Sequence, residues 1–200
     1  FPSNPDLNDT MHVYADVYMN NAFIGDLNQE WGALVINGDL RAPAGGVFDM
    51  RDGDPHGTID IYGTFSVGQD FLHYIDVDFG RETYEFPSAD FLFLEYDVSG
   101  LTTIHINTVG TTAHPEEVLT IAHNRGAISL SNFALSTGQY FPAGIWQYEL
   151  AINSGDIYLT PVTLSGMPAF FDLSIDEGWN IDQLLSAGLA VQPYVPLYEA

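Results

Sequence analysis

The chain has 200 residues, of which 46% are hydrophobic, so it is long enough and apolar enough to bury a sizeable core. Its charge is one-sided, because 27 acidic residues stand against four arginines and no lysine, for a formal net charge of -23. This balance excludes nucleic acid as a partner, since binding to phosphate backbones needs a basic face, and it disfavours docking on anionic lipid. The chain has no cysteine, which rules out a disulfide framework, a thiolate metal site and a cysteine nucleophile.

Apolar and polar residues alternate through most of the chain with the two-residue period of a β-strand. The segments with this pattern are, in chain order, 34–40, 58–65, 71–79, 92–98, 104–106, 118–121, 128–135, 146–152 and 157–159. Corners rich in glycine, asparagine and aspartate separate them, for example at 37–39, 52–54 and 153–156. The chain is therefore predicted to be all-β.

Two segments share a form that indicates a repeat. Residues 34–40 and 59–65 both read apolar, any residue, apolar, any residue, glycine, any residue, apolar. Loose repetition of strand and corner is typical of an irregular β-solenoid, in which each rung buries its face on its neighbours. A β-sandwich has a similar spacing of strands and remains the alternative.

The last part of the chain has a different pattern. Residues 174–191 place Leu184, Leu185 and Leu189 on a possible helical stripe, which predicts a short helix. Pro193 and Pro196 then favour extended backbone and would stop the helix.

Several motifs in a fixed order resemble one known family. They are Gly57 to Gly63, the Ser88-Ala89-Asp90-Phe91-Leu92 strand, Gly100 to Asn107, Gly110-Thr111-Thr112, Val118 to Ile121, a hairpin at 144–150 and 155–159, and a closing Val195 to Ala200. In this order they resemble the distal passenger region of bacterial autotransporters, the pertactin-like autochaperone segment. The resemblance covers about half of the chain, with the short terminal motif added.

The resemblance implies the C-terminal end of a right-handed parallel β-helix. It implies three parts: upstream rungs at 1–56, an autochaperone-like end with its cap at 57–165, and a linker at 166–200 that leads to an outer-membrane barrel outside this chain. The expected function is non-enzymatic, with no cofactor: the segment nucleates passenger folding during export and presents an adhesin or effector at the bacterial cell surface. Expected partners are the barrel and a host or cell-surface ligand. The residues expected to form the folding cap are Trp146, Tyr148, Leu150, Ile157, Tyr158 and Leu159.

Residues 52–57 begin like a calcium loop, with Asp52, Asp54 and a glycine at the sixth position. An EF-hand also needs an oxygen ligand at the fifth position and a glutamate at the twelfth, where this chain has His56 and Gly63. A solvated turn is the preferred interpretation, so no metal site is expected. The six histidines are His12, His56, His73, His105, His114 and His123; they show no metal-binding spacing. A triad of Ser88, His105 and Asp90 has no nucleophile-elbow sequence to support it.

A carbohydrate-active β-helix enzyme, either a lyase or a glycosidase, is the alternative function, because glycoside hydrolysis commonly uses two carboxylates. Asp76 and Asp78 share a strand face, and Asp60 lies on an earlier strand. Tyr62 and Tyr74 could stack on sugars, although packing between rungs is the preferred interpretation. The scarcity of arginine argues against a lyase for acidic sugars, which would need basic residues to stabilise charge.

Overall fold

The structure, a computed structural model, describes residues 10–25, 33–79, 89–109, 118–143 and 146–162. The chain divides into two units, 1–162 and 163–200, and every described residue belongs to the first. The helix expected at 174–191 and the linker expected at 166–200 lie outside the described residues. In the described part of the chain, no helix is long and apolar enough to span a bilayer.

The strands of the described residues form three sheets, named A, B and C. Sheet A has the order β1 (Thr10–Val13), β4 (Ala33–Ile36), β7 (Thr58–Ile61), β10 (Phe91–Leu94), β13 (Leu119–Asn124), β17 (Asp156–Pro161), β16 (Trp146–Asn153), β15 (Phe141–Ala143). Sheet B has the order β11 (Val98–Ser99), β8 (Phe65–Val67), β5 (Leu40–Ala42), β2 (Val17–Tyr18). Sheet C has the order β14 (Phe133–Leu135), β12 (Thr102–Val109), β9 (Phe71–Asp78), β6 (Gly46–Asp49), β3 (Ala22–Gly25).

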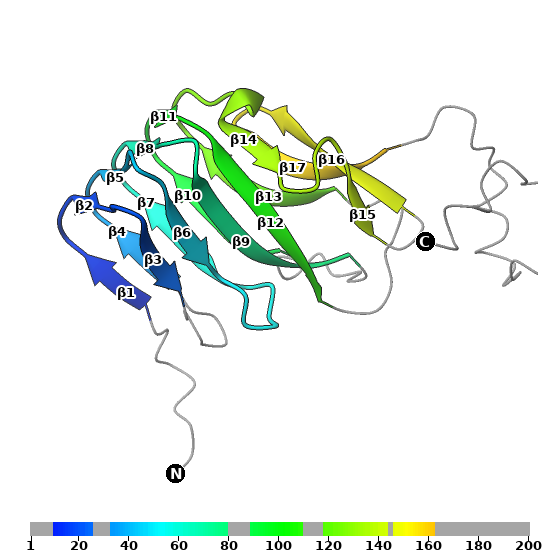
Figure 1. Cartoon of the computed structure of the whole chain (residues 1–200), viewed down its shortest axis with the longest axis horizontal. Coiled ribbons are helices and arrows are strands. Elements are labelled where there is room, and N and C mark those ends of the chain that lie inside the picture. Colours follow the sequence, from blue (N-terminus) through cyan, green and yellow to red (C-terminus); the bar gives the residue numbers. More distant parts are fainter. Residues whose placement is uncertain (1–9, 26–32, 80–88, 110–117, 144–145, 163–200) are drawn as a thin grey trace, which may run out of the picture. The chain divides into compact units, whose positions relative to one another are not determined.

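Each strand from β1 to β10 pairs in parallel with the strand three places along the chain, so three successive strands make one rung (Figure 1). Rungs 1 to 4 are β1–β3, β4–β6, β7–β9 and β10–β12. Rung 5 consists of β13, the 3-10 turn η1 (Leu130–Asn132) and β14. This pairing confirms the predicted parallel β-helix. It contradicts the sandwich alternative, which requires two packed antiparallel sheets.

The repeated pattern of residues 34–40 and 59–65 is explained by the register of rungs 2 and 3. Leu34 stacks on Ile59 and Leu40 stacks on Phe65. Neither segment is one strand, however, because each bends at its glycine and passes from sheet A to sheet B. At that corner a Cβ atom on Gly63 would lie 2.3 Å from the backbone of Gly38, so the stacked corners leave no room for a side chain.

The core lies between the three sheets and consists of apolar stacks that run from rung to rung. One stack in sheet A joins Leu34, Ile59 and Leu92. A second group is aromatic: Phe48, Phe65 and Phe71 are each 0% exposed, and their ring centroids lie 5.0 to 6.4 Å apart. Alternation along each strand therefore sends one side chain into a shared core and the next to the outside.

Part of the large acidic content has a structural use at the corner between sheets A and B. The Asp16 carboxylate accepts a hydrogen bond from the Asp39 backbone N–H at 3.0 Å, and the Asp39 carboxylate accepts one from Thr64 at 2.9 Å. Further along the stack, Asp97 accepts one from Ala127 at 3.1 Å. At a corner the strand ladder is interrupted, so some backbone N–H groups have no carbonyl partner there. These carboxylates accept the hydrogen bonds of such N–H groups.

Candidate functional site

The parallel stack ends in an antiparallel hairpin. Strands β16 and β17 are joined by Ser154 and Gly155, and β17 pairs antiparallel with β13 of rung 5. Strand β15 then pairs with the other edge of β16. The hairpin therefore covers the edge of β13 that a sixth parallel rung would otherwise occupy, which is how an exposed strand edge is protected from pairing with other chains.

Three of the six residues predicted for the cap are fully buried. Tyr148, Ile157 and Leu159 are each 0% exposed, and Leu150 is partly buried against the core. Tyr158 lies between Ile157 and Leu159 on β17, so alternation places it on the opposite face, where it is only partly buried. Trp146 belongs to β16, but its side chain lies outside the described part of the structure.

Two further aromatic residues belong to this end and were missed by the sequence analysis. The Phe79 ring lies 4.6 Å from that of Tyr148 and 5.7 Å from that of Phe141, measured between centroids. Phe79 directly follows β9, and Phe141 begins β15. The alternating pattern of 71–79 marked Phe79 as a buried residue, but no local signal indicated that it would meet a hairpin about 70 positions further along the chain.

The two ends of the described stack differ in burial. In rung 1, the core-facing side chains of Val13, Val17 and Ile24 are only partly buried. Their partners one rung later, Ile36, Leu40 and Phe48, are each 0% exposed. Burial of apolar surface is the main favourable term in folding, so these three positions of rung 1 contribute less to stability than their partners in rung 2.

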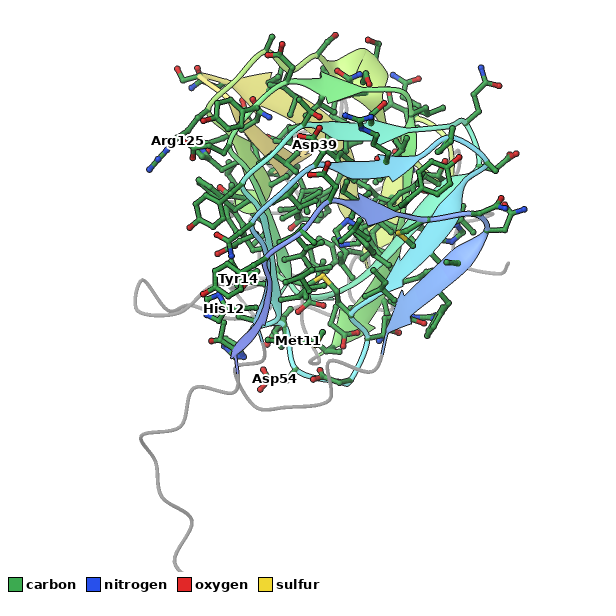
Figure 2. The ribbon with its side chains drawn as sticks, turned by 90° about the vertical axis from the view of Figure 1, so that its left-hand side faces the viewer. Met11, His12, Tyr14, Asp39, Asp54 and Arg125 are labelled. Atoms are coloured by element: carbon green, nitrogen blue, oxygen red, sulfur yellow. The ribbon has the colours of Figure 1, made fainter. Side chains whose placement is uncertain are left out.

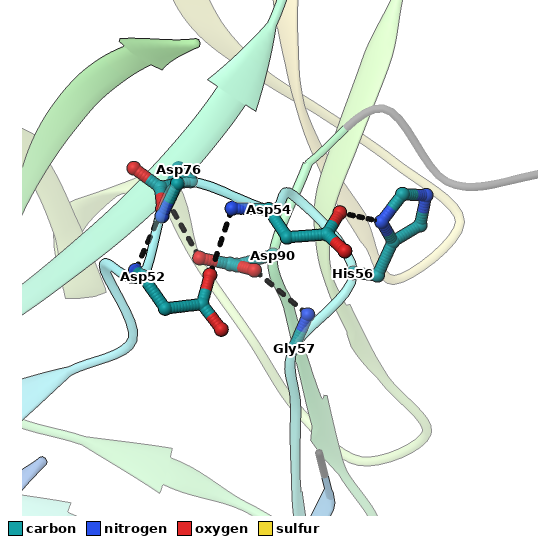
Figure 3. Close-up of polar contacts among 7 residues, drawn as sticks. Asp52, Asp54, His56, Gly57, Asp76 and Asp90 are labelled. Atoms are coloured by element: carbon teal, nitrogen blue, oxygen red, sulfur yellow. Dashed lines mark hydrogen bonds and ion pairs between the residues drawn. The ribbon is translucent and has the colours of Figure 1, made fainter. Parts of the chain in front are cut away.

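A second candidate site lies at the corner that joins sheets C and A, where two buried aspartates organise the backbone (Figure 3). Asp76 and Asp90 are each 0% exposed. Asp76 accepts hydrogen bonds from the backbone N–H groups of Asp52 at 2.9 Å and Gly53 at 2.6 Å, and also from the Asn107 amide. Asp90 accepts from the N–H groups of Gly57 at 2.8 Å and Asp76 at 2.7 Å. The two carboxylates therefore hold three segments of the chain together.

Burial raises the pKa of Asp90 to about 8, and the negative charges of Asp76 and Asp52 act in the same direction. The N–H groups of Asp76 and Gly57 act against this shift, because they donate to the carboxylate. Burial also raises the pKa of Asp52, whose side chain accepts a hydrogen bond from the Asp54 N–H at 2.8 Å. A strongly shifted carboxyl group is a frequent mark of a functional site, but here its partners are backbone groups of a corner.

The calcium-like segment 52–57 uses its carboxylates internally. Asp52 caps the Asp54 N–H, and Asp54 pairs with the Nδ1 atom of His56 (Figure 3). Among the residues that the structure describes, no group of three or more histidine, aspartate or glutamate side chains is placed to hold a metal ion. The arrangement is that of a self-capped turn.

The histidines lie in different surroundings. His73 is in the core, 3.1 Å from the Met50 sulfur, and burial lowers its pKa to about 4. His105 lies on the outer face of β12, as its alternation with Ile104 predicts, and stacks on Tyr74 with ring centroids 4.4 Å apart. His123 pairs with Asp156 at 2.6 Å. His114 and Ser88 lie outside the described residues. The triad of Ser88, His105 and Asp90 can therefore be placed only in part. Asp90 accepts hydrogen bonds from backbone N–H groups, whereas His105 stacks on Tyr74.

The carboxylates of the alternative enzyme are divided between two sheets. Asp60 is on β7 in sheet A, whereas Asp76 and Asp78 are on β9 in sheet C. Asp76 is fully buried and already accepts three hydrogen bonds. The structure therefore does not bring Asp60 together with the other two as a pair flanking a common bond.

The two tyrosines proposed as sugar-stacking residues have different surroundings. The Tyr74 ring is sandwiched between His105 and the guanidinium of Arg51, which lies 4.1 Å from its centroid. Its faces are therefore occupied, as the packing interpretation predicts. Tyr62 is 44% exposed and touches Phe93 at a tilted angle, with centroids 5.8 Å apart. Tyr62 therefore keeps a free aromatic surface.

No protein-family model and no curated protein sequence matches the chain. Among solved structures, the chain is similar to the Haemophilus influenzae Hap adhesin, with 17% sequence identity and a TM-score of 0.49. The match covers 76% of this chain and 18% of the Hap chain. The fold assignment rests on the strand pairing of this chain itself.

Proposed function

We propose that this chain is the capped distal part of a β-helical passenger of autotransporter type, and that hairpin β16–β17 nucleates its folding. The passenger would reach the bacterial cell surface through the periplasm and the outer membrane, with an outer-membrane barrel of the same polypeptide as its partner. The motif order in the sequence supports this proposal. In this role the segment is non-enzymatic, presents an adhesin or effector and needs no cofactor.

One observation carries the proposal: the two ends of the described stack are not equivalent. The hairpin end buries Tyr148, Ile157 and Leu159 completely, whereas rung 1 buries Met19 but leaves Val13, Val17 and Ile24 only partly buried. In a solenoid, stability is approximately a sum of rung energies and neighbour interfaces, so folding starts where both are largest and propagates. A capped end would then act as the template on which later rungs are laid down.

Two matched leucines in the full chain test this order of folding. Leu159 in the cap and Leu40 in rung 2 are both 0% exposed, so replacement of either by alanine should cost about 2 to 5 kcal/mol of unfolding free energy. If the cap nucleates folding, Leu159→Ala slows refolding, whereas Leu40→Ala mainly accelerates unfolding. Stopped-flow refolding and unfolding in urea measure both rates.

Deletion of residues 144–160 extends the test. We expect this deletion to abolish cooperative refolding, whereas removal of rung 1 leaves a cooperative transition. The proposal is wrong if the chain without the hairpin refolds at the normal rate, or if Leu40→Ala slows refolding as much as Leu159→Ala does. A screen for depolymerisation of polysaccharides tests the non-enzymatic part of the proposal, and a catalysed loss of chain length would contradict it.

A further inference from the structure

The outer face of sheet A carries a row of residues in register along the stack. Tyr14, Asn37, Tyr62, Glu95 and Arg125 occupy equivalent positions, each just after the sheet A strand of its rung. The backbone confirms the register, because the N–H groups of Asn37, Tyr62, Glu95 and Arg125 bind carbonyls of the preceding rung at 2.7 to 3.0 Å. Tyr14 and Arg125 project from the same side of the molecule in Figure 2. The row is therefore one continuous strip of surface across five rungs.

Two aromatic rings of this strip are open to solvent. Tyr14 is 78% exposed and stacks on His12, with centroids 5.7 Å apart and an angle of 13° between the planes. Tyr62 is 44% exposed. Phe93 lies on β10, beside the row rather than in it, and its ring is more occupied, since His123 stacks on it and the Arg125 guanidinium lies 5.2 Å from its centroid. Tyr14 and Tyr62 are thus the free rings of the strip.

The spacing of these two rings is set by the fold. They lie two rungs apart, and neighbouring strands are about 4.8 Å apart, so their backbones are separated by about 10 Å along the stack. The rung between them presents Asn37, which is exposed and whose amide can both donate and accept hydrogen bonds. The first three residues of the strip therefore present an aromatic ring, an amide and a second aromatic ring, in that order.

This alternation suits an extended sugar chain. A pyranose ring has an apolar face that stacks on tyrosine and hydroxyl groups at its rim that bind amides, and amphipathic tyrosine rings serve both needs. Two rungs are comparable in length to one disaccharide unit of an extended β-linked glycan, so alternate rings of the sugar chain would meet Tyr14 and Tyr62. The net charge of -23 repels polyanions, which selects a neutral glycan over sulfated or uronic acid polymers.

We propose that the sheet A strip binds a neutral, extended, β-linked polysaccharide along the axis of the stack, with Tyr14 and Tyr62 as stacking platforms and Asn37 as the hydrogen-bonding residue between them. The site holds the glycan without cleaving it. This binding role is independent of the folding role of the hairpin.

Affinity electrophoresis of the full chain in native gels tests the proposal. The probes are hydroxyethylcellulose, xyloglucan and galactomannan as neutral β-linked glycans, with dextran sulfate as the polyanion. We expect at least one neutral glycan to retard the chain. The double variant Tyr14→Ala/Tyr62→Ala should bind that glycan at least about tenfold more weakly, which corresponds to the loss of the stacking contacts. Tyr14→Phe/Tyr62→Phe should retain most of the binding, because the rings remain.

The matched control is Tyr18→Ala, because Tyr18 is 70% exposed but lies on β2 in sheet B. It should bind as the unaltered chain does. Circular dichroism and refolding rates should be unchanged in all variants, which separates this test from that of the hairpin. The proposal is overturned if no neutral glycan retards the chain, if the double alanine variant binds as tightly as the unaltered chain, or if dextran sulfate retards the chain as strongly.

Discussion

At the scale of single residues, buried carboxylates and tight glycines are what make the corners of this stack possible. Gly63 is required because the corner of rung 3 lies directly against Gly38 of rung 2. Asp90 is required for a different reason, since it joins Gly57 at the start of β7 to Asp76 on β9. Both residues act between segments that are distant in sequence, so substitution of either would affect the assembly of rungs more than the local backbone.

The Asp90 carboxyl group should make stability depend on pH. Its pKa is about 8 in the folded chain against 3.8 as the ordinary value, so the folded state binds the proton more tightly than the unfolded state between these limits. Its stabilising contribution is fully present below about pH 4 and is lost as the pH rises through about 8. We expect the unfolding free energy of the unaltered chain to fall over this window relative to Asp90→Asn, which does not titrate.

Urea unfolding from pH 5 to 9 measures this difference. Asparagine can accept only one of the two N–H groups that Asp90 binds, so Asp90→Asn is less stable at low pH, and the gap between the two proteins narrows as the pH rises. His73 also titrates, and its lowered pKa makes both proteins more stable as the pH rises from about 4 to 6.5. Because this contribution is the same in both, it cancels in the difference between them. The exposed Asp70→Asn is the control. A gap that stays constant with pH would contradict the prediction.

At the scale of elements, the hairpin β16–β17 differs from every connection within rungs 1 to 4 because it reverses direction in two residues. Ser154 has φ 52° and Gly155 has φ 93°, which is the left-handed geometry of a type I′ turn. This turn matches the twist of antiparallel strands and fixes the register of Ile152 opposite Ile157. The turn therefore positions the buried face of the cap.

Ser154 is the weak position of this turn, because serine adopts positive φ less readily than asparagine does. We expect Ser154→Asn to raise the unfolding free energy by about 0.5 to 1 kcal/mol, the size of effect seen when a new residue prefers the native backbone conformation. Ser154→Val should lower the unfolding free energy by about 1 to 2 kcal/mol, because a β-branched side chain disfavours positive φ. Thermal unfolding followed by circular dichroism measures both. Ser136→Asn is the control, because Ser136 is an exposed serine outside the hairpin and has no positive φ. Equal stability of the asparagine and valine variants would mean that the turn does not have this geometry in solution.

At the scale of the whole molecule, one-sided charge opposes the compact state. With a net charge of -23, the carboxylates that cap corners are accompanied by many that only repel. The described ion pairs with arginine are few and partly exposed: Arg41 with Asp39, Arg51 with Asp49, and Arg125 with Glu95. Exposed pairs of this kind contribute little, so the repulsion is the larger electrostatic effect.

Salt should therefore stabilise the chain. Raising NaCl from about 10 mM to about 150 mM shortens the Debye length from about 30 Å to about 8 Å and screens the repulsion. We expect the midpoint of thermal unfolding to rise by several degrees in calorimetry. Choline chloride at the same ionic strength should act equally, since the effect is screening rather than binding of a particular cation. A midpoint that falls with salt would show that the ion pairs outweigh the repulsion.

Four features follow from the order of amino acids alone: the all-β class, the alternation that selects core residues, the corners marked by Gly, Asn and Asp, and the similarity of residues 34–40 and 59–65. These are local properties, because the two-residue period decides which face a side chain takes and small residues decide where the chain can bend. The register between rungs, in contrast, is visible only in the folded chain. The fold placed Phe79 against Tyr148, joined Asp76 to Asp90, and aligned Tyr14 with Tyr62 across two rungs. Alternation fixes the face of a side chain but not its partner, because the partner depends on how many residues each rung takes to return to the same sheet.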